Sequence, residues 1–102
     1  MLAAILESGE ANRLYTGLSL LVSTAVEAEP ARGLVSFGAL RVLRTDLGPH
    51  LRELLQTAEA LEDLRLYACA AAVDATGTDA GLPVLSTPRF LRETAGARLV
   101  VV

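Results

Sequence analysis

The stretch Leu64-Arg65-Leu66-Tyr67-Ala68-Cys69-Ala70-Ala71-Ala72 decides the fold, because it joins a strand, a thiol and a helix start within nine residues. Its first five residues form a short, largely apolar run, which predicts a strand that ends at Ala68. The small residues after Cys69 predict the first turn of a helix. Cys69, the only cysteine of the chain, therefore lies at the carboxyl end of a strand, where open α/β sheets place their chemistry.

Short apolar runs of the same kind alternate with helical patterns along the whole sequence. Further strands are expected at residues 2–6, 34–37 and 98–102, with Val84-Leu85 as a very short additional candidate. Helical spacing of apolar residues, or a helix start such as Ser86-Thr87-Pro88, predicts helices over residues 10–29, 38–44, 51–61 and 87–96. Residues 74–79 are expected to form a turn-rich loop.

Strands that alternate with helices are typical of a parallel sheet with right-handed crossover connections. The expected strands are apolar without polar alternation, as strands covered on both faces are. We therefore predict an α/β fold, a three-layer α/β/α sandwich with a four- to five-stranded parallel sheet. A length of 102 residues accommodates one such domain, spanning residues 1–102.

The chain is rich in apolar residues for its length. Hydrophobic residues make up 52% of it, a large share for so short a chain to bury alone, and the helix over 10–29 carries apolar residues beyond one stripe. We therefore expect a homo-oligomer. The net charge is −3 and the nine basic residues, all arginine, are scattered, which argues against nucleic acid as a partner.

Cysteine usage and the amino-terminal segment indicate a cytoplasmic protein. One cysteine cannot form an intramolecular disulfide, and residues 1–6 lack the basic segment and the apolar length of a secretion signal. The longest weakly polar stretch, residues 14–26, is shorter than the roughly 20 residues that span a bilayer. We therefore expect no membrane partner.

Cys69 has two interpretations. Backbone N–H groups at a helix start favour the thiolate, which is the reactive form of cysteine, so the residue can carry chemistry. Free cysteine is also among the most buried residue types, so the side chain can equally be a small hydrophobe of the core. The sequence alone leaves both open.

Other candidate residues have structural explanations beside the functional ones. Ser8-Gly9 follows the first strand, where doubly wound folds cradle phosphate or nucleotides, but a strand-to-helix turn is the favoured interpretation. Asp74, five residues after Cys69, is a site candidate for which a turn is again favoured. One Cys and one His cannot complete a tetrahedral metal site, so we expect no metal and no cofactor.

One protein family shares several of these features. The segment Tyr67-Ala68-Cys69 is followed by Asp74 and Gly77, and a later helix containing Phe90-Leu91 leads to a terminal apolar strand. In these respects the chain resembles the small DsrE/DsrF-like proteins of bacterial sulfur metabolism. The resemblance covers nearly the whole chain.

The resemblance implies a flavodoxin-like domain that assembles as a trimer or a higher closed ring. It also implies that Cys69 carries sulfur as a persulfide, received from a donor protein and passed to an acceptor protein. Ser8-Gly9 after the first strand and Ser36-Phe37 closing the second fit the same layout. The residues expected to line the site around Cys69 are Ser8, Gly9, Phe37, Gly38, Ala70 and Asp74.

Two functions follow. The first is a small cytoplasmic sulfur carrier of the sulfurtransferase type, in which the sulfur must pass from Cys69 to another molecule because no second cysteine is present. The second is a non-catalytic oligomeric binding module in which Cys69 is structural. Ala72 stands where the family often has a hydroxyl residue, so a hydrogen bond that would orient the sulfur is expected to be missing. Whether the chain is an enzyme is left open.

Overall fold

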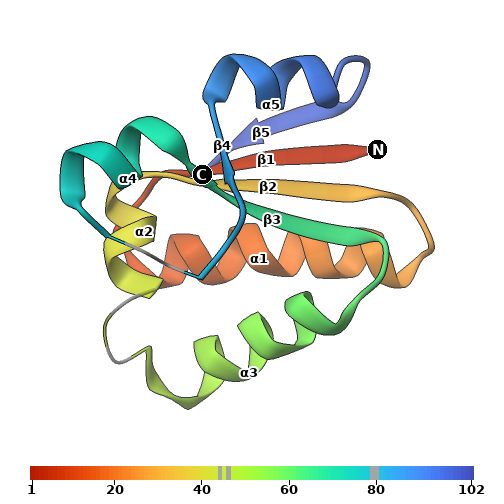
Figure 1. Ribbon diagram of the computed structural model, residues 1–102. Helices are drawn as coiled ribbons and strands as arrows, with labels where there is room; N and C mark the ends of the chain where they lie inside the picture. The colour runs from red at the N-terminus through yellow and green to blue at the C-terminus, as the bar shows by residue number, and fades with distance from the viewer. Residues whose placement is uncertain (44, 46, 79–80) are drawn as a thin grey trace.

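The computed structural model describes residues 1–43, 45, 47–78 and 81–102, in which strands and helices alternate as expected (Figure 1). The strands are β1 (Leu2–Leu6), β2 (Ala31–Val35), β3 (Leu64–Cys69), β4 (Val84–Leu85) and β5 (Arg98–Val101). The helices are α1 (Ala11–Val26), α2 (Phe37–Leu43), α3 (Gly48–Ala60), α4 (Ala70–Thr76) and α5 (Thr87–Glu93). The very short strand expected at Val84-Leu85 is thus confirmed.

The strands of the described residues pair in parallel and form one five-stranded sheet in the order β4-β3-β2-β1-β5. This confirms the predicted parallel sheet. The two edges of the sheet differ, because β4 pairs with β3 only at Ala68 and Cys69. The strand at the other edge, β5, pairs with β1 over its full length from Arg98 to Val101.

Helices cover both faces of the sheet, which confirms the three-layer, flavodoxin-like α/β/α sandwich (Figure 1). Helices α1 and α3 pack side by side on one face, whereas α5 lies on the other. Helices α2 and α4 contact each other beside the carboxyl ends of the strands. Helix α5 is held down by Phe90, a fully buried side chain that meets Tyr67 of β3 edge to face, with ring centroids 6.4 Å apart.

Helix α1 lies close to the sheet because β2 carries a glycine beneath it. A Cβ added at Gly33 would come within 2.8 Å of the side chains of Leu21 in α1 and Leu66 in β3, so glycine leaves room for both leucines. The residues that α1 buries against the sheet follow the helical spacing that the sequence predicts: Leu14, Leu18, Leu21 and Ala25.

The second strand differs from the expected one at both ends. It begins at Ala31 and ends at Val35, so Ser36 and Phe37 do not close it. Phe37 opens α2 instead and has a φ of 23°, a backbone conformation that L side chains rarely adopt. The Ser36 N–H donates to the Leu6 carbonyl at 2.9 Å, which ties this turn to the end of β1. The strand thus stays bonded to β1 up to Ser36, and the positive φ of Phe37 marks the change from strand to helix.

The turn expected from Asp74 is wrong at its first residues, because α4 continues through Asp74 to Thr76. The alanine-rich segment before Asp74 favours helix, and the Thr76 hydroxyl donates to the Ala72 carbonyl at 2.6 Å within the last turn. The helix ends at Gly77, whose φ of 64° is the left-handed conformation that glycine adopts at helix ends.

Two other helices are shorter than expected. Helix α1 ends at Val26 rather than at residue 29, and α5 ends at Glu93 rather than at residue 96. Arg44, at the end of the helix expected over 38–44, and Asp79, in the loop expected over 74–79, lie outside the described residues.

Candidate functional site

The carboxyl ends of neighbouring strands bring most of the predicted site residues to one edge of the sheet (Figure 1). Ser8 and Gly9 follow β1, Phe37 and Gly38 begin α2 just after β2, Cys69 ends β3 and Ala70 begins α4. Because the strands are adjacent and parallel, these ends lie side by side, as they do at the binding edge of other open α/β sheets.

The Cys69 side chain is free and buried, with 2% of the residue exposed. Its sulfur lies 3.6 Å from the hydroxyl oxygen of Thr87, the first residue of α5. The hydroxyl of Ser36 and the N–H groups of Ala71 and Ala72 also act on the sulfur. The thiol therefore faces two hydroxyls and a helix start rather than an entirely apolar pocket.

Burial and these neighbouring groups shift the pKa of the Cys69 thiol in opposite directions. Burial raises the pKa of the Cys69 thiol, because removal from water disfavours the thiolate. The Ala72 N–H, the Thr87 and Ser36 hydroxyls and the Ala71 N–H together lower the pKa by more. The N–H groups of Ala71 and Ala72 lower the pKa although the Cys69 side chain makes no capping hydrogen bond at the start of α4. The net pKa lies below the ordinary value of a free thiol, so the thiolate fraction at a given pH is larger than that of a free thiol.

Thr87 and Ser36 are both missing from the residues expected to line the site. Sequence patterns mark Thr87 only as part of a helix start and Ser36 only as the end of a strand. In the structure β4 pairs Leu85 with Cys69, and the chain reaches Thr87 two residues later. A hydroxyl residue two positions after the short strand candidate Val84-Leu85 is the signal that would have pointed to it. From Ala72, the sequence predicts that the sulfur lacks an orienting hydrogen bond. This expectation is corrected, because the Thr87 hydroxyl supplies a polar contact to the sulfur.

Gly38 lets two turns near the site approach closely because it has no side chain. A Cβ added at Gly38 would lie 2.7 Å from the nitrogen of Gly9 and 2.9 Å from the carbonyl oxygen of Glu7, and both are backbone atoms. The turn after β1 and the turn after β2 are thus in direct backbone contact. Ser36, two residues before Gly38, is among the groups that act on the sulfur.

The predicted site residues Ser8 and Asp74, and the only histidine of the chain, His50, are occupied elsewhere or lie apart from the sulfur. The Ser8 hydroxyl accepts a hydrogen bond from the Glu10 N–H at 3.0 Å, which is the behaviour of a turn residue. Asp74 is exposed on α4, and His50 is exposed near the start of α3. Neither Asp74 nor His50 is among the groups that act on the Cys69 thiol.

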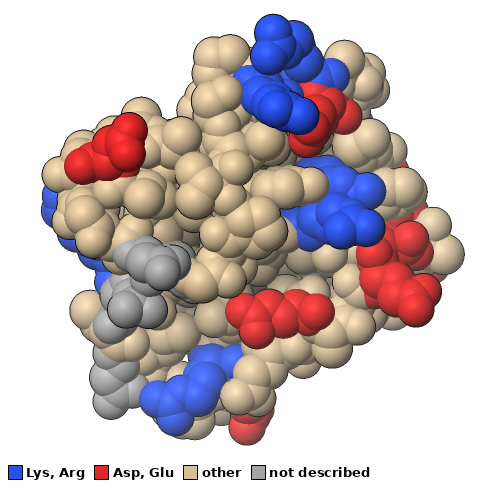
Figure 2. Space-filling model, in the orientation of Figure 1, with Lys and Arg blue, Asp and Glu red and all other residues tan. Residues whose placement is uncertain are grey.

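Outside the surroundings of Cys69, the described surface has fewer groups that could carry a reaction. A recess of about 220 Å³ runs along β3 between α3 and Leu82-Pro83, and it does not include Cys69. No group of three or more His, Cys, Asp or Glu side chains that could hold a metal ion occurs among the described residues. None of the described helices has the length and apolarity needed to cross a membrane. On the face drawn in Figure 2, acidic and basic side chains are interspersed.

A scan against protein-family models finds no match to this chain, and a search of curated proteins likewise finds none.

Proposed function

We propose that this protein is a sulfur carrier of the sulfurtransferase type, in which the Cys69 thiolate accepts a sulfane sulfur and passes it on. The observation that carries the proposal is the set of donors around a buried sulfur: the hydroxyls of Thr87 and Ser36 and the N–H groups of Ala71 and Ala72. A neutral thiol is a weak acceptor and needs no such set, whereas a thiolate is stabilised by every one of these donors.

The transfer needs no oxidant. The Cys69 thiolate attacks the outer sulfur of a donor persulfide, a new S–S bond forms at Cys69, the S–S bond of the donor breaks, and the donor leaves as a thiolate. An acceptor nucleophile then takes the outer sulfur from Cys69, and the Cys69 thiolate is restored. Because Cys69 is the only cysteine, no intramolecular disulfide competes with the second step.

The burial of Cys69 has a consequence for a carrier. With 2% of the residue exposed, partners and small reagents alike can reach the sulfur only through local movement of the chain around it. The donor and the acceptor must reach the sulfur at the carboxyl edge of the sheet, where Phe37 beside Ser36 is 39% exposed. Donor and acceptor proteins are therefore the partners that the proposal implies, as the DsrE-like resemblance suggests. The cysteine usage of the sequence favours the cytoplasm as their location.

The second candidate is a non-catalytic oligomeric binding module. The same burial favours it, because Cys69 packs within the main hydrophobic core together with Ala68 and Ala72. On this alternative the thiol is a small core side chain, and assembly through exposed apolar residues is the function.

Mass spectrometry after incubation with inorganic polysulfide separates the two candidates. A carrier gains the mass of one sulfur atom in the folded state and loses it on reduction, whereas Cys69→Ser gains none. Native-state alkylation provides the matching measurement on the same proteins. Adduct formation and alkylation that occur only after unfolding contradict the carrier and favour the structural role of Cys69.

A further inference from the structure

The two edges of the sheet are protected very differently. At one edge β4 is only two residues long and follows Pro83, features that keep other strands from pairing. At the other edge β5 presents four residues, and no strand in the described part of the chain covers its outer side. Leu99 and Val101 of β5 are 48% and 62% exposed. An exposed apolar edge of this kind is a template for another strand.

The backbone groups that face outward on β5 can be assigned. The Arg98 N–H donates to the Met1 carbonyl at 3.1 Å, and the Val102 N–H donates to the Ile5 carbonyl at 2.9 Å, so both point towards β1. Successive residues of a strand direct their N–H and C=O groups to opposite sides. The outward groups of β5 are therefore those of Leu99 and Val101, the same two residues whose apolar side chains are exposed.

We propose that a second copy of this chain pairs with β5 in antiparallel orientation, with a two-fold axis at Val100. In this register Leu99 of each copy lies opposite Val101 of the other, and both pairs exchange N–H and C=O bonds. All four outward donors and acceptors of each copy are then satisfied. The two five-stranded sheets join into one of ten strands. An isologous contact of this kind closes as a dimer.

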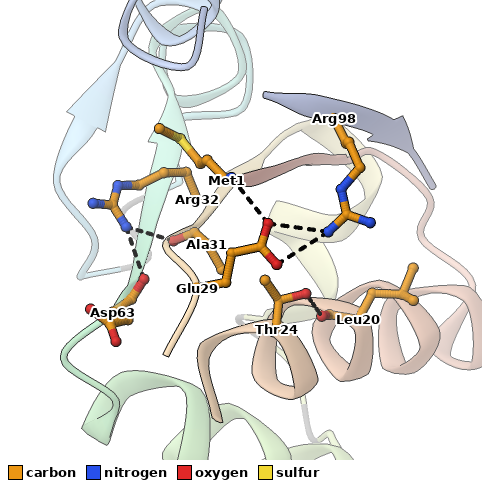
Figure 3. Close-up of polar contacts among 8 residues, drawn as sticks. All are labelled: Met1, Leu20, Thr24, Glu29, Ala31, Arg32, Asp63 and Arg98. Carbon is orange, nitrogen blue, oxygen red and sulfur yellow. Dashed lines mark hydrogen bonds and ion pairs between the residues drawn. The ribbon is translucent and has the colours of Figure 1, made fainter. Parts of the chain in front are cut away.

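The side chains of β5 suit pairing with the same strand of a second copy. Leu99 and Val101 extend from the same side of β5 and would meet each other across the axis as apolar cross-strand pairs. Arg98, the one charge on β5, is held by Glu29 at 3.2 Å on the α1 side of the sheet (Figure 3). Below it α1 offers the exposed Leu20 and the half-buried Thr24, whose hydroxyl donates to the Leu20 carbonyl. Two copies therefore meet without unpaired like charges.

The dimer is independent of the proposed sulfur chemistry. In the sheet, β2 and β1 separate β5 from β3, the strand that ends at Cys69. A variant that loses the dimer should keep its sulfur adduct, and Cys69→Ser should keep its dimer. The dimer also differs from the trimer or higher ring that the family resemblance implies, because a closed ring uses two different surfaces of each copy.

Light scattering and sedimentation on the full chain test the interface. The unmodified chain and Val84→Lys should have twice the chain mass of 10.7 kDa. Val84 is a matched control, because it is also an exposed valine on an edge strand, at the opposite edge. Val101→Lys should be monomeric with unchanged circular dichroism, and its Kd for association should rise at least about tenfold. A monomer or trimer for the unmodified chain, or dissociation by Val84→Lys alone, overturns the proposal.

Cross-linking tests the register even if Val101→Lys folds poorly. In a Cys69→Ser background, Val100→Cys places two thiols in a non-hydrogen-bonded pair, where the Cα atoms are about 4.5 Å apart and a disulfide fits. The control Leu99→Cys places its two thiols two residues out of register, beyond the roughly 7 Å that a disulfide spans. Mild oxidation should give covalent dimers with Val100→Cys only. No cross-link with Val100→Cys, or an equal yield with Leu99→Cys, overturns the proposed pairing.

Discussion

The sulfur of Cys69 and the hydroxyl oxygen of Thr87 lie 3.6 Å apart, although the two residues are 18 positions apart in the sequence. They meet because β4 runs beside β3, after which the chain enters α5 on the face opposite α1 and α3. The pKa of the Cys69 thiol therefore depends on Thr87, which lies in a different connection between strands. Thr87 can be substituted without changing Cys69 itself.

Replacing Thr87 by valine should raise the pKa of Cys69, because it removes one of the donors that favour the thiolate. The pH midpoint of native-state iodoacetamide labelling should move to higher pH. Ser86→Ala is the control, since the Ser86 hydroxyl accepts from the Arg89 N–H at 3.3 Å and caps α5 without being among the groups that act on the sulfur. Equal shifts of the pH midpoint in both variants would mean that loosening of α5, and not loss of the Thr87 hydroxyl, changes the pKa of Cys69.

The lowered pKa of Cys69 also predicts a stability that depends on pH. In the unfolded chain the thiol has a pKa of about 8.5, and in the folded chain the pKa is lower. Between these two values the unfolded state binds more protons, so the free energy of unfolding relative to Cys69→Ser rises with pH. The contribution is complete above about pH 8.5 and is lost as the pH falls through the folded-state pKa. Urea denaturation of both proteins measures it, and a difference that falls with rising pH contradicts the assignment.

Gly38→Ala should destabilise the fold by about 1–3 kcal/mol, because its Cβ would meet backbone atoms of Gly9 and Glu7 that cannot rotate away. Gly9→Ala is the matched control, since its nearest new contacts, with Gly38, begin at an ordinary 3.5 Å. Urea denaturation should rank Gly38→Ala well below Gly9→Ala. Equal stabilities would show that the two turns are not held in the described contact.

Leu21→Ala should cost about 2–5 kcal/mol, because Leu21 is fully buried between α1 and the sheet. Its neighbour Leu20 is 42% exposed on the same helix, so Leu20→Ala should change the free energy of unfolding by no more than about 0.5 kcal/mol. Chemical denaturation of the two single variants checks this difference. The opposite ranking would mean that the other face of α1 packs on the sheet.

Local sequence was sufficient for β1 and for the buried stripe of α1. The strand expected at residues 2–6 coincides with β1, because its apolar run is bounded by polar and flexible residues and is buried against helices and neighbouring strands. Leu14 and Leu18 are buried because helical spacing places both on the face that meets the sheet.

The site depended on contacts between distant segments, and sequence patterns could predict it only in part. Cys69 was predictable, since the end of an apolar run marks a strand end. Thr87 was not, because its place beside the sulfur depends on the pairing of the two-residue strand β4. The end of β2 was also missed, since the apolar run continues to Phe37 whereas the backbone turns there, with a φ of 23°.

Helix α5 carries Thr87 at its start and Phe90 one turn later. Thr87 contacts the thiol, and Phe90 fills the core against Tyr67. This one short helix therefore connects the packing of the core with the pKa of Cys69. A substitution beneath Phe90 that shifts this helix would displace the Thr87 hydroxyl and alter the ionisation of Cys69 from a distance. Mutations selected for thermal tolerance could thereby tune the reactivity of the thiol, and selection for reactivity would in turn limit how freely this part of the core can be repacked.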